Sequence, residues 1–204
     1  MRSRAALVPA VVLALAATAC GHADGEVGVI ATVTPSSSSA APTTAAVAPI
    51  DAGAELNERG NIVKAVGEPG GIRRTADPEA PTVLTFTVED MVINPECDSG
   101  FELAPATANY LGIRMRVETT PDYDPRQLRT ISEYDFAILD ADGTPLPDVI
   151  GNGQVCFGEE DELSHRRFGP GLAYEGWVVL DMPIRTGTLV YQPADQPNGW
   201  EWAF

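Results

Sequence analysis

The chain offers few side chains that could catalyse a reaction. Its two histidines are His22, near the N-terminus, and His165, which precedes Arg166 and Arg167. A Ser-His-Asp triad would have to use His165 as its general base. No G-x-S-x-G segment, which presents the nucleophilic serine in one large class of hydrolases, accompanies it. The sequence therefore predicts no catalytic residue, and we expect His165 to lie in an exposed loop.

Two acidic segments supply oxygen ligands of the kind that hard cations prefer. Asp140-Ala141-Asp142-Gly143 resembles the start of a calcium loop, but Thr144-Pro145-Leu146-Pro147 follow where an EF-hand needs further ligands. A tight turn explains the same residues, because Asp and Gly favour turn conformations. Glu159-Glu160-Asp161-Glu162 is a better candidate for weak cation binding, although a solvated acidic loop is more common. We assign no metal ligand and no cofactor.

Three cysteines, Cys20, Cys97 and Cys156, are present. Neither Cys97 nor Cys156 has a partner at C-x-x-C spacing, which disfavours a metal site. In an exported domain two cysteines most often pair, and two buried reduced thiols are the alternative. A Cys97–Cys156 disulfide would close a loop of about 60 residues and contribute roughly 4 kcal/mol in the chain-entropy model. It would also hold the base of the acidic segment that follows Cys156.

The elements that must position these side chains have the patterns of strands. In Tyr110 to Val117, apolar side chains from Leu111 onward alternate with Gly112, Arg114 and Arg116, the period of a half-buried strand. No window shows a sustained helical period, and Pro or Gly recurs every 8 to 12 residues or so, as in an all-β sandwich. A single helical turn is expected near residues 125–128. The other predicted strands are Thr82 to Ile93, Tyr134 to Leu139, Gln154 to Phe157, Ala173 to Met182, Gly187 to Gln192 and Gly199 to Phe204.

Aromatic residues mark where a core can form. Every Trp, Tyr and Phe lies after Ile62, and the remaining length predicts one domain over residues 62–204. Trp177, Trp200 and Trp202 could line a sugar or peptide groove, but Trp200 and Trp202 share a strand face with Phe204, which favours core packing. Residues 20–61 are rich in Ser, Thr, Ala and Pro, so they predict a disordered linker.

The N-terminus has the order of a secretory signal. Arg2 and Arg4 precede an apolar run, Ala5 to Ala19, which ends in small residues before Cys20. This ending resembles a bacterial lipobox, whose cysteine carries lipid on its thiol and becomes the first mature residue. The alternative is ordinary cleavage after Ala17-Thr18-Ala19. The run is too short for a transmembrane helix, which needs about 20 apolar residues. The sequence therefore predicts a signal peptide over residues 1–19 and a lipid-anchored protein on the extracytoplasmic face of the cell membrane.

Charge excludes one class of partner. The formal net charge is -16, and the basic residues form no linear patch. Such a surface repels phosphate backbones and anionic headgroups, so nucleic acid is not an expected partner.

Two segments carry a resemblance to a known family. Phe136-Ala137-Ile138-Leu139-Asp140-Ala141-Asp142-Gly143 resembles a hallmark strand and turn, and residues 169–183 resemble a second hallmark, with Leu180 in the usual Phe place. The family comprises envelope lipoproteins of Gram-positive and actinobacterial cells, with an immunoglobulin-like domain of unknown function similar in fold to a secreted mycobacterial antigen. The resemblance implies an immunoglobulin-like antiparallel β-sandwich and an envelope location, but no activity.

Three functions fit these observations. We prefer a non-enzymatic binding or interaction module, held by a lipid-anchored linker, whose ligand is an envelope protein or a glycan. The first alternative is a metal-dependent envelope enzyme or a cation-binding factor that uses the acidic loops, which requires them to converge. The second is a structural or immunogenic surface protein without a specific ligand.

Overall fold

The computed structural model describes residues 50–77, 79–101, 103–126, 131–164, 166–194 and 196–204. The predicted signal peptide, Cys20, most of the predicted linker and His165 lie outside these residues. In chain order the elements are β1 (Ile62–Val63), β2 (Pro69–Arg73), β3 (Thr82–Ile93), β4 (Asn109–Thr119), the 3-10 turn η1 (Glu133–Asp135), β5 (Phe136–Leu139), the 3-10 turn η2 (Gly153–Val155), β6 (Ala173–Met182), β7 (Thr188–Tyr191) and β8 (Trp200–Ala203).

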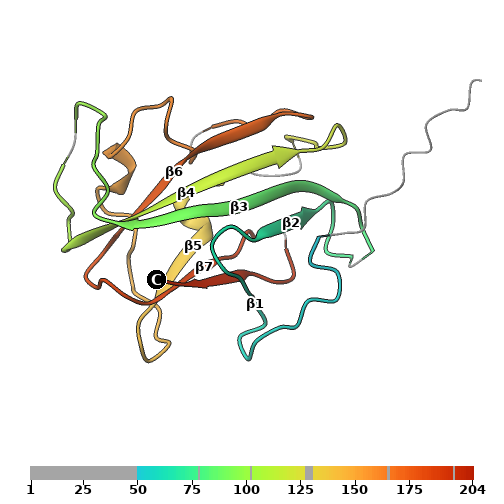
Figure 1. The fold of residues 1–204 in the computed structure, drawn as a ribbon, viewed down its shortest axis with the longest axis horizontal. Helices are drawn as coiled ribbons and strands as arrows, with labels where there is room; N and C mark the ends of the chain where they lie inside the picture. The colour runs from blue at the N-terminus through green and yellow to red at the C-terminus, as the bar shows by residue number, and fades with distance from the viewer. Residues whose placement is uncertain (1–49, 78, 102, 127–130, 165, 195) are drawn as a thin grey trace, which may run out of the picture. The chain divides into compact units, whose positions relative to one another are not determined.

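The strands form two four-stranded sheets. One has the order β2-β3-β4-β6 and is antiparallel throughout, with its strands side by side in Figure 1. The other has the order β1-β8-β7-β5, in which the short β1 runs parallel to β8 and the other pairs are antiparallel. Side chains from both sheets share one core cluster. The prediction of an all-β sandwich is therefore confirmed.

In the longest strands, every second side chain over much of the length is apolar and points into the core. The side chains of Leu111, Ile113, Met115 and Val117 on β4 are all buried, as predicted. β3 buries Leu84, Phe86 and Val88, and its register with β4 shifts after Val88.

An aromatic cluster joins the two sheets. The ring of Phe86 on β3 meets Tyr191 and Trp200 edge to face, with centroid distances of 5.0 and 4.8 Å. Trp202 is also buried, and Phe204 packs against the same core. The prediction that the C-terminal tryptophans serve the core is confirmed.

Residues 50–61 belong to the folded domain, although their composition assigned them to the linker. Asp51 pairs with Lys64 at 2.5 Å and accepts a hydrogen bond from Trp200 Nε1 at 2.8 Å. The buried carboxylate of Glu201 accepts hydrogen bonds from the side chains of Asn57, Arg59 and Asn61. The apolar composition of this segment did not predict its place in the domain, because ion pairs and hydrogen bonds hold it there.

Two local predictions differ from the structure. Residues 154–157 were expected as a strand. Instead, Gln154 and Val155 belong to the 3-10 turn η2, and Cys156 and Phe157 follow it outside any strand. Gly153 explains the turn: a Cβ there would lie 2.2 Å from the Val179 carbonyl oxygen, so only glycine lets this segment approach β6 so closely. Of the predicted helical turn, Pro125 and Arg126 lie in a non-helical turn, and residues 127–130 lie outside the described residues.

Candidate functional site

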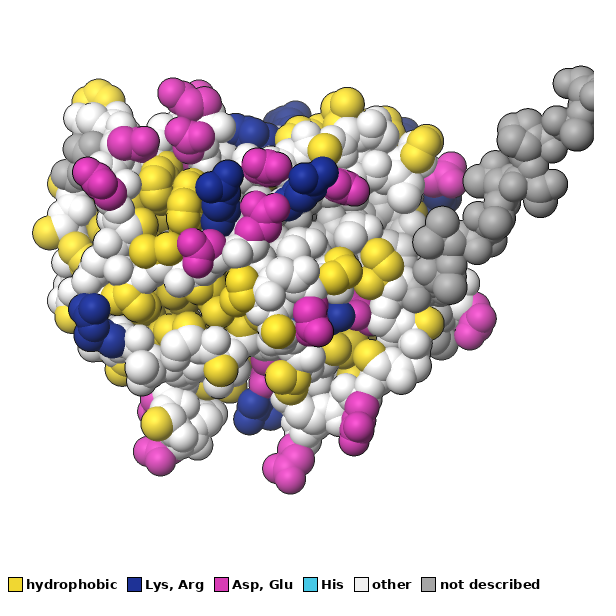
Figure 2. All heavy atoms as spheres, viewed as in Figure 1, with side chains coloured by type: hydrophobic (Ala, Val, Ile, Leu, Met, Phe, Trp, Pro, Cys, Tyr) yellow, Lys and Arg dark blue, Asp and Glu magenta, His cyan; other side chains and the backbone are white. Residues whose placement is uncertain are grey.

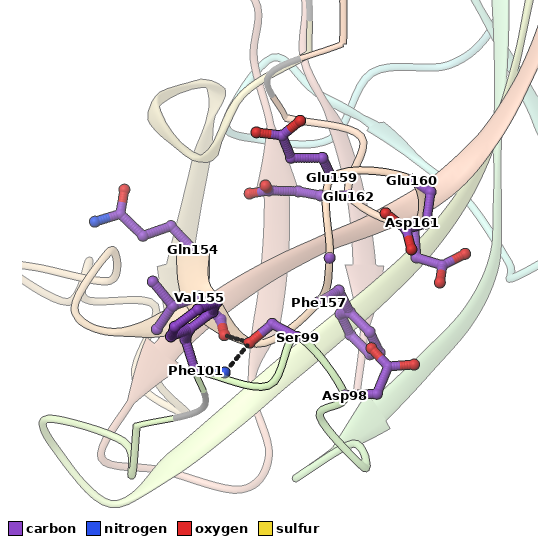
Figure 3. Close-up of a pocket in the computed structure, with 11 residues that line it drawn as sticks. Asp98, Ser99, Phe101, Gln154, Val155, Phe157, Glu159, Glu160, Asp161 and Glu162 are labelled. Carbon is purple, nitrogen blue, oxygen red and sulfur yellow. Dashed lines mark hydrogen bonds between the residues drawn. The ribbon is translucent and has the colours of Figure 1, made fainter. Parts of the chain in front are cut away.

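A groove of about 540 Å³ lies where the loop after β3 meets η2 and the segment that follows it. Figure 3 shows its lining side chains, which come from two stretches far apart in the sequence. We call it the acidic groove. Its lining consists of Asp98, Ser99, Phe101, Gln154, Val155, Phe157, Gly158, Glu159, Glu160, Asp161 and Glu162.

A disulfide joins the two walls of the acidic groove. Cys97 and Cys156 are bonded, with their Cα atoms 4.6 Å apart, so the predicted pairing is confirmed. The backbone N–H groups of Asp98 and Ser99 donate to the Cys156 carbonyl at 3.0 and 3.2 Å. The Ser99 hydroxyl donates to the Val155 carbonyl at 2.6 Å and accepts the Phe101 N–H at 3.1 Å, as the dashed lines in Figure 3 mark. These bonds fix the walls to each other.

Aromatic side chains supply the apolar part of the groove. Phe157 stacks on Trp177 of β6, with centroids 5.0 Å apart and ring planes 13° apart. Phe101 is 83% exposed, an unusual position for so large an apolar side chain. Sequence analysis missed both phenylalanines as site residues; their closeness to Cys97 and Cys156 in the sequence was the available signal.

Among the described lining residues of the groove, the charged side chains are all acidic. They supply five carboxylates, and no Lys or Arg is among them. Arg166 lies close by, but its guanidinium donates to the backbone carbonyls of Glu159 and Glu160 and so holds their loop through the main chain. Glu162 accepts a hydrogen bond from the Ser164 hydroxyl at 2.8 Å.

Charges on the outer face of the β2-β3-β4-β6 sheet are arranged differently. Arg114 lies 3.6 Å from both Glu89 and Glu175, and Arg116 lies 2.7 Å from Glu118. Figure 2 shows basic and acidic side chains close together over these strands. On this face the arginines pair with the acidic side chains, unlike in the acidic groove.

The acidic segments do not converge on a cation site within the described residues. There, no group of three or more His, Cys, Asp or Glu side chains has the arrangement to hold a metal. Asp140 and Asp142 do not line the groove. The Asp140 carboxylate instead accepts the N–H groups of Asp142 and Thr144 at 3.0 and 2.9 Å, and Gly143 has a φ of 79°. This segment forms the tight turn that the sequence favoured over a calcium loop.

A buried carboxylate links two segments that lead into the groove loops. Asp181 of β6 is 1% exposed and accepts hydrogen bonds from Ala106 N–H, Asn152 N–H, and both the N–H and hydroxyl of Thr107. Burial opposes ionisation, but these hydrogen bonds outweigh it and lower the pKa of Asp181. The carboxylate thereby ties the loop after β3 to the segment before η2. Asp181 was not predicted as a site residue. Its one signal in the sequence is that an acidic side chain occurs within an apolar strand.

Comparison with protein-family models, curated proteins and solved structures finds no match to this chain. The resemblance to immunoglobulin-like envelope lipoproteins therefore stays a prediction. The part of the chain that the structure describes contains no helix long and apolar enough to cross a membrane.

Proposed function

We propose that the protein is a lipid-anchored, extracytoplasmic binding module of the cell envelope, without catalytic activity, and that the acidic groove is its binding site. The predicted signal peptide over residues 1–19 and Cys20, which follows it directly, support the anchor. An aromatic-lined concave surface of a few hundred Å³ is typical of ligand sites.

The observation that carries this proposal is the position of the groove along β3. The Ile50 N–H donates to the Thr82 hydroxyl at 3.1 Å, so the first described residue lies where β3 begins. Asp98, which lines the groove, lies five residues after Ile93, where β3 ends. The 12 residues of β3 span roughly 36 Å at about 3.3 Å per residue, and Figure 1 shows the two regions at opposite ends of the domain. A domain held through residue 50 presents the groove at its far end.

Rigidity favours binding over a purely structural role. The Cys97–Cys156 disulfide and the hydrogen bonds of Asp181 hold both walls before any ligand arrives. A preformed site loses less conformational entropy when it binds.

Anchoring and binding are tested separately in cells that produce the full chain. For anchoring, we expect palmitate labelling and membrane association of the wild type, and the loss of both in Cys20→Ala. Membrane association of that variant equal to wild type would refute the anchor.

For binding, a photo-reactive amino acid replaces either Phe101 in the groove or Tyr134, which lies outside it and is similarly exposed. We expect a discrete cross-link from position 101 that excess unmodified protein suppresses, and none from position 134. Equal cross-linking at both positions, or none, would favour the structural or immunogenic alternative.

A further inference from the structure

We propose that the occupant of the acidic groove is a basic, arginine-containing segment of a partner protein. This inference rests on the proposed function, because it takes the groove as the binding site and names the chemistry of its ligand.

The exposed carboxylates at the rim of the groove have no basic partners in ion pairs within the described residues. Within the described residues, Arg59, Lys64, Arg114 and Arg116 form ion pairs at other places on the domain. No described Lys or Arg forms an ion pair with the exposed carboxylates at the rim, which belong to Asp98, Glu159, Glu160 and Asp161. Charges of one sign in a concave site concentrate the opposite charge from solution. Arg166 contacts this loop only through the main-chain carbonyls of Glu159 and Glu160 among its described contacts there, and one guanidinium does not balance four exposed carboxylates. The groove therefore keeps an excess of negative charge and favours a cation.

The volume of the groove indicates the size of its occupant. A volume of about 540 Å³ lies within the range of organic ligand sites, about 300–1,000 Å³, and far exceeds a single ion. The described carboxylates also form no cluster that could hold a metal. A basic peptide, which spreads several positive charges over a surface, fits this volume and charge.

Aromatic rings beside the acidic rim favour one kind of cation. A guanidinium is planar and stacks on aromatic rings while it donates to carboxylates. Phe101, which is largely exposed, and Phe157, backed by Trp177, provide rings next to the acidic rim. An uncharged glycan could stack on such rings and donate hydroxyl hydrogen bonds to the carboxylates, but it would gain no charge–charge attraction from the rim. The combination therefore favours arginine.

Calorimetric titration of the purified full chain tests the inference. The probes are three capped decapeptides, (Arg-Gly)5, (Lys-Gly)5 and (Glu-Gly)5, and a neutral chito-oligosaccharide. We expect (Arg-Gly)5 to bind several-fold more tightly than (Lys-Gly)5, and to weaken at least fivefold between 50 and 200 mM NaCl because screening shortens the reach of the rim charges. We expect no binding of the other two probes. Tight binding of the oligosaccharide, or of (Glu-Gly)5, would overturn the inference.

Two triple variants with equal changes in net charge separate the groove from general acidity. Glu159→Gln, Glu160→Gln and Asp161→Asn keep the side-chain shapes and the carbonyls that Arg166 contacts, and we expect a Kd for (Arg-Gly)5 at least tenfold higher. The control variant, Glu58→Gln with Glu79→Gln and Asp142→Asn, changes exposed acids outside the groove, and we expect less than a twofold change.

Equal weakening in both triple variants would refute a specific site. Absence of (Arg-Gly)5 binding together with a suppressible cross-link from position 101 would refute the ligand class and leave the proposed function standing. Loss of both would refute the groove as a binding site.

Discussion

Replacement of Asp181 by alanine should destabilise the domain. Its carboxylate is 1% exposed and accepts four hydrogen bonds from the 104–107 and 150–152 segments. A hydrogen bond to a charged acceptor contributes about 1.5–3 kcal/mol, and an orphaned buried donor costs about 1–3 kcal/mol. The carboxylate's own desolvation offsets part of this sum. We therefore expect Asp181→Ala to lower the free energy of unfolding by about 3–4 kcal/mol.

Urea unfolding followed by tryptophan fluorescence measures this change. The matched control is Asp142→Ala, an exposed acid for which we expect a change within about 0.5 kcal/mol. A loss below about 1 kcal/mol in Asp181→Ala would show that the hydrogen-bonded carboxylate does not hold the two segments together.

The same residue predicts a pH dependence with a definite sign. Because folding lowers the pKa of Asp181, its contribution is full above the unfolded pKa of about 4 and is lost as the pH falls through the folded value. Wild-type stability should therefore decline more steeply below about pH 4 than that of Asp181→Asn, which cannot titrate there. Parallel declines in the two proteins would contradict this assignment.

Three further predictions concern the disulfide, the core and the attachment of residues 57–61. Replacing Cys97 and Cys156 by alanine together should lower the free energy of unfolding by roughly 4 kcal/mol, measured by urea titration, and an unchanged midpoint would contradict a stabilising bridge. Phe86→Ala removes the ring between the two sheets and should cost about 3–5 kcal/mol in the same assay; less than 2 would mean that the core closes over the cavity. Glu201→Gln should weaken the attachment of residues 57–61, so limited proteolysis should cut there first, and wild-type resistance would count against that role.

The acidic groove shows where prediction from sequence stops. The cysteine count predicted its disulfide, and the sequence placed the acidic run beside it. Phe101 and Phe157 lie near the paired cysteines in the sequence, but the stacking of Phe157 on Trp177 depends on tertiary packing between separate segments. The support from Asp181 was equally hidden, since its partner Thr107 lies 74 residues away.

Local patterns determined most of the fold. Alternation in β4 identified the buried face, because side chains on a strand point to opposite sides at every step. The Trp200 and Trp202 pair marked a core strand for the same reason. The tertiary structure alone decided which strands are neighbours, such as the two-residue β1 parallel to β8, and which loops meet at the end of β3. Pairing and convergence depend on contacts between residues distant in sequence, and no local period encodes them. The sequence by itself thus determined a disulfide-bonded β domain whose strands have one buried face. The packing of its loops decided that it carries an acidic, aromatic-lined groove.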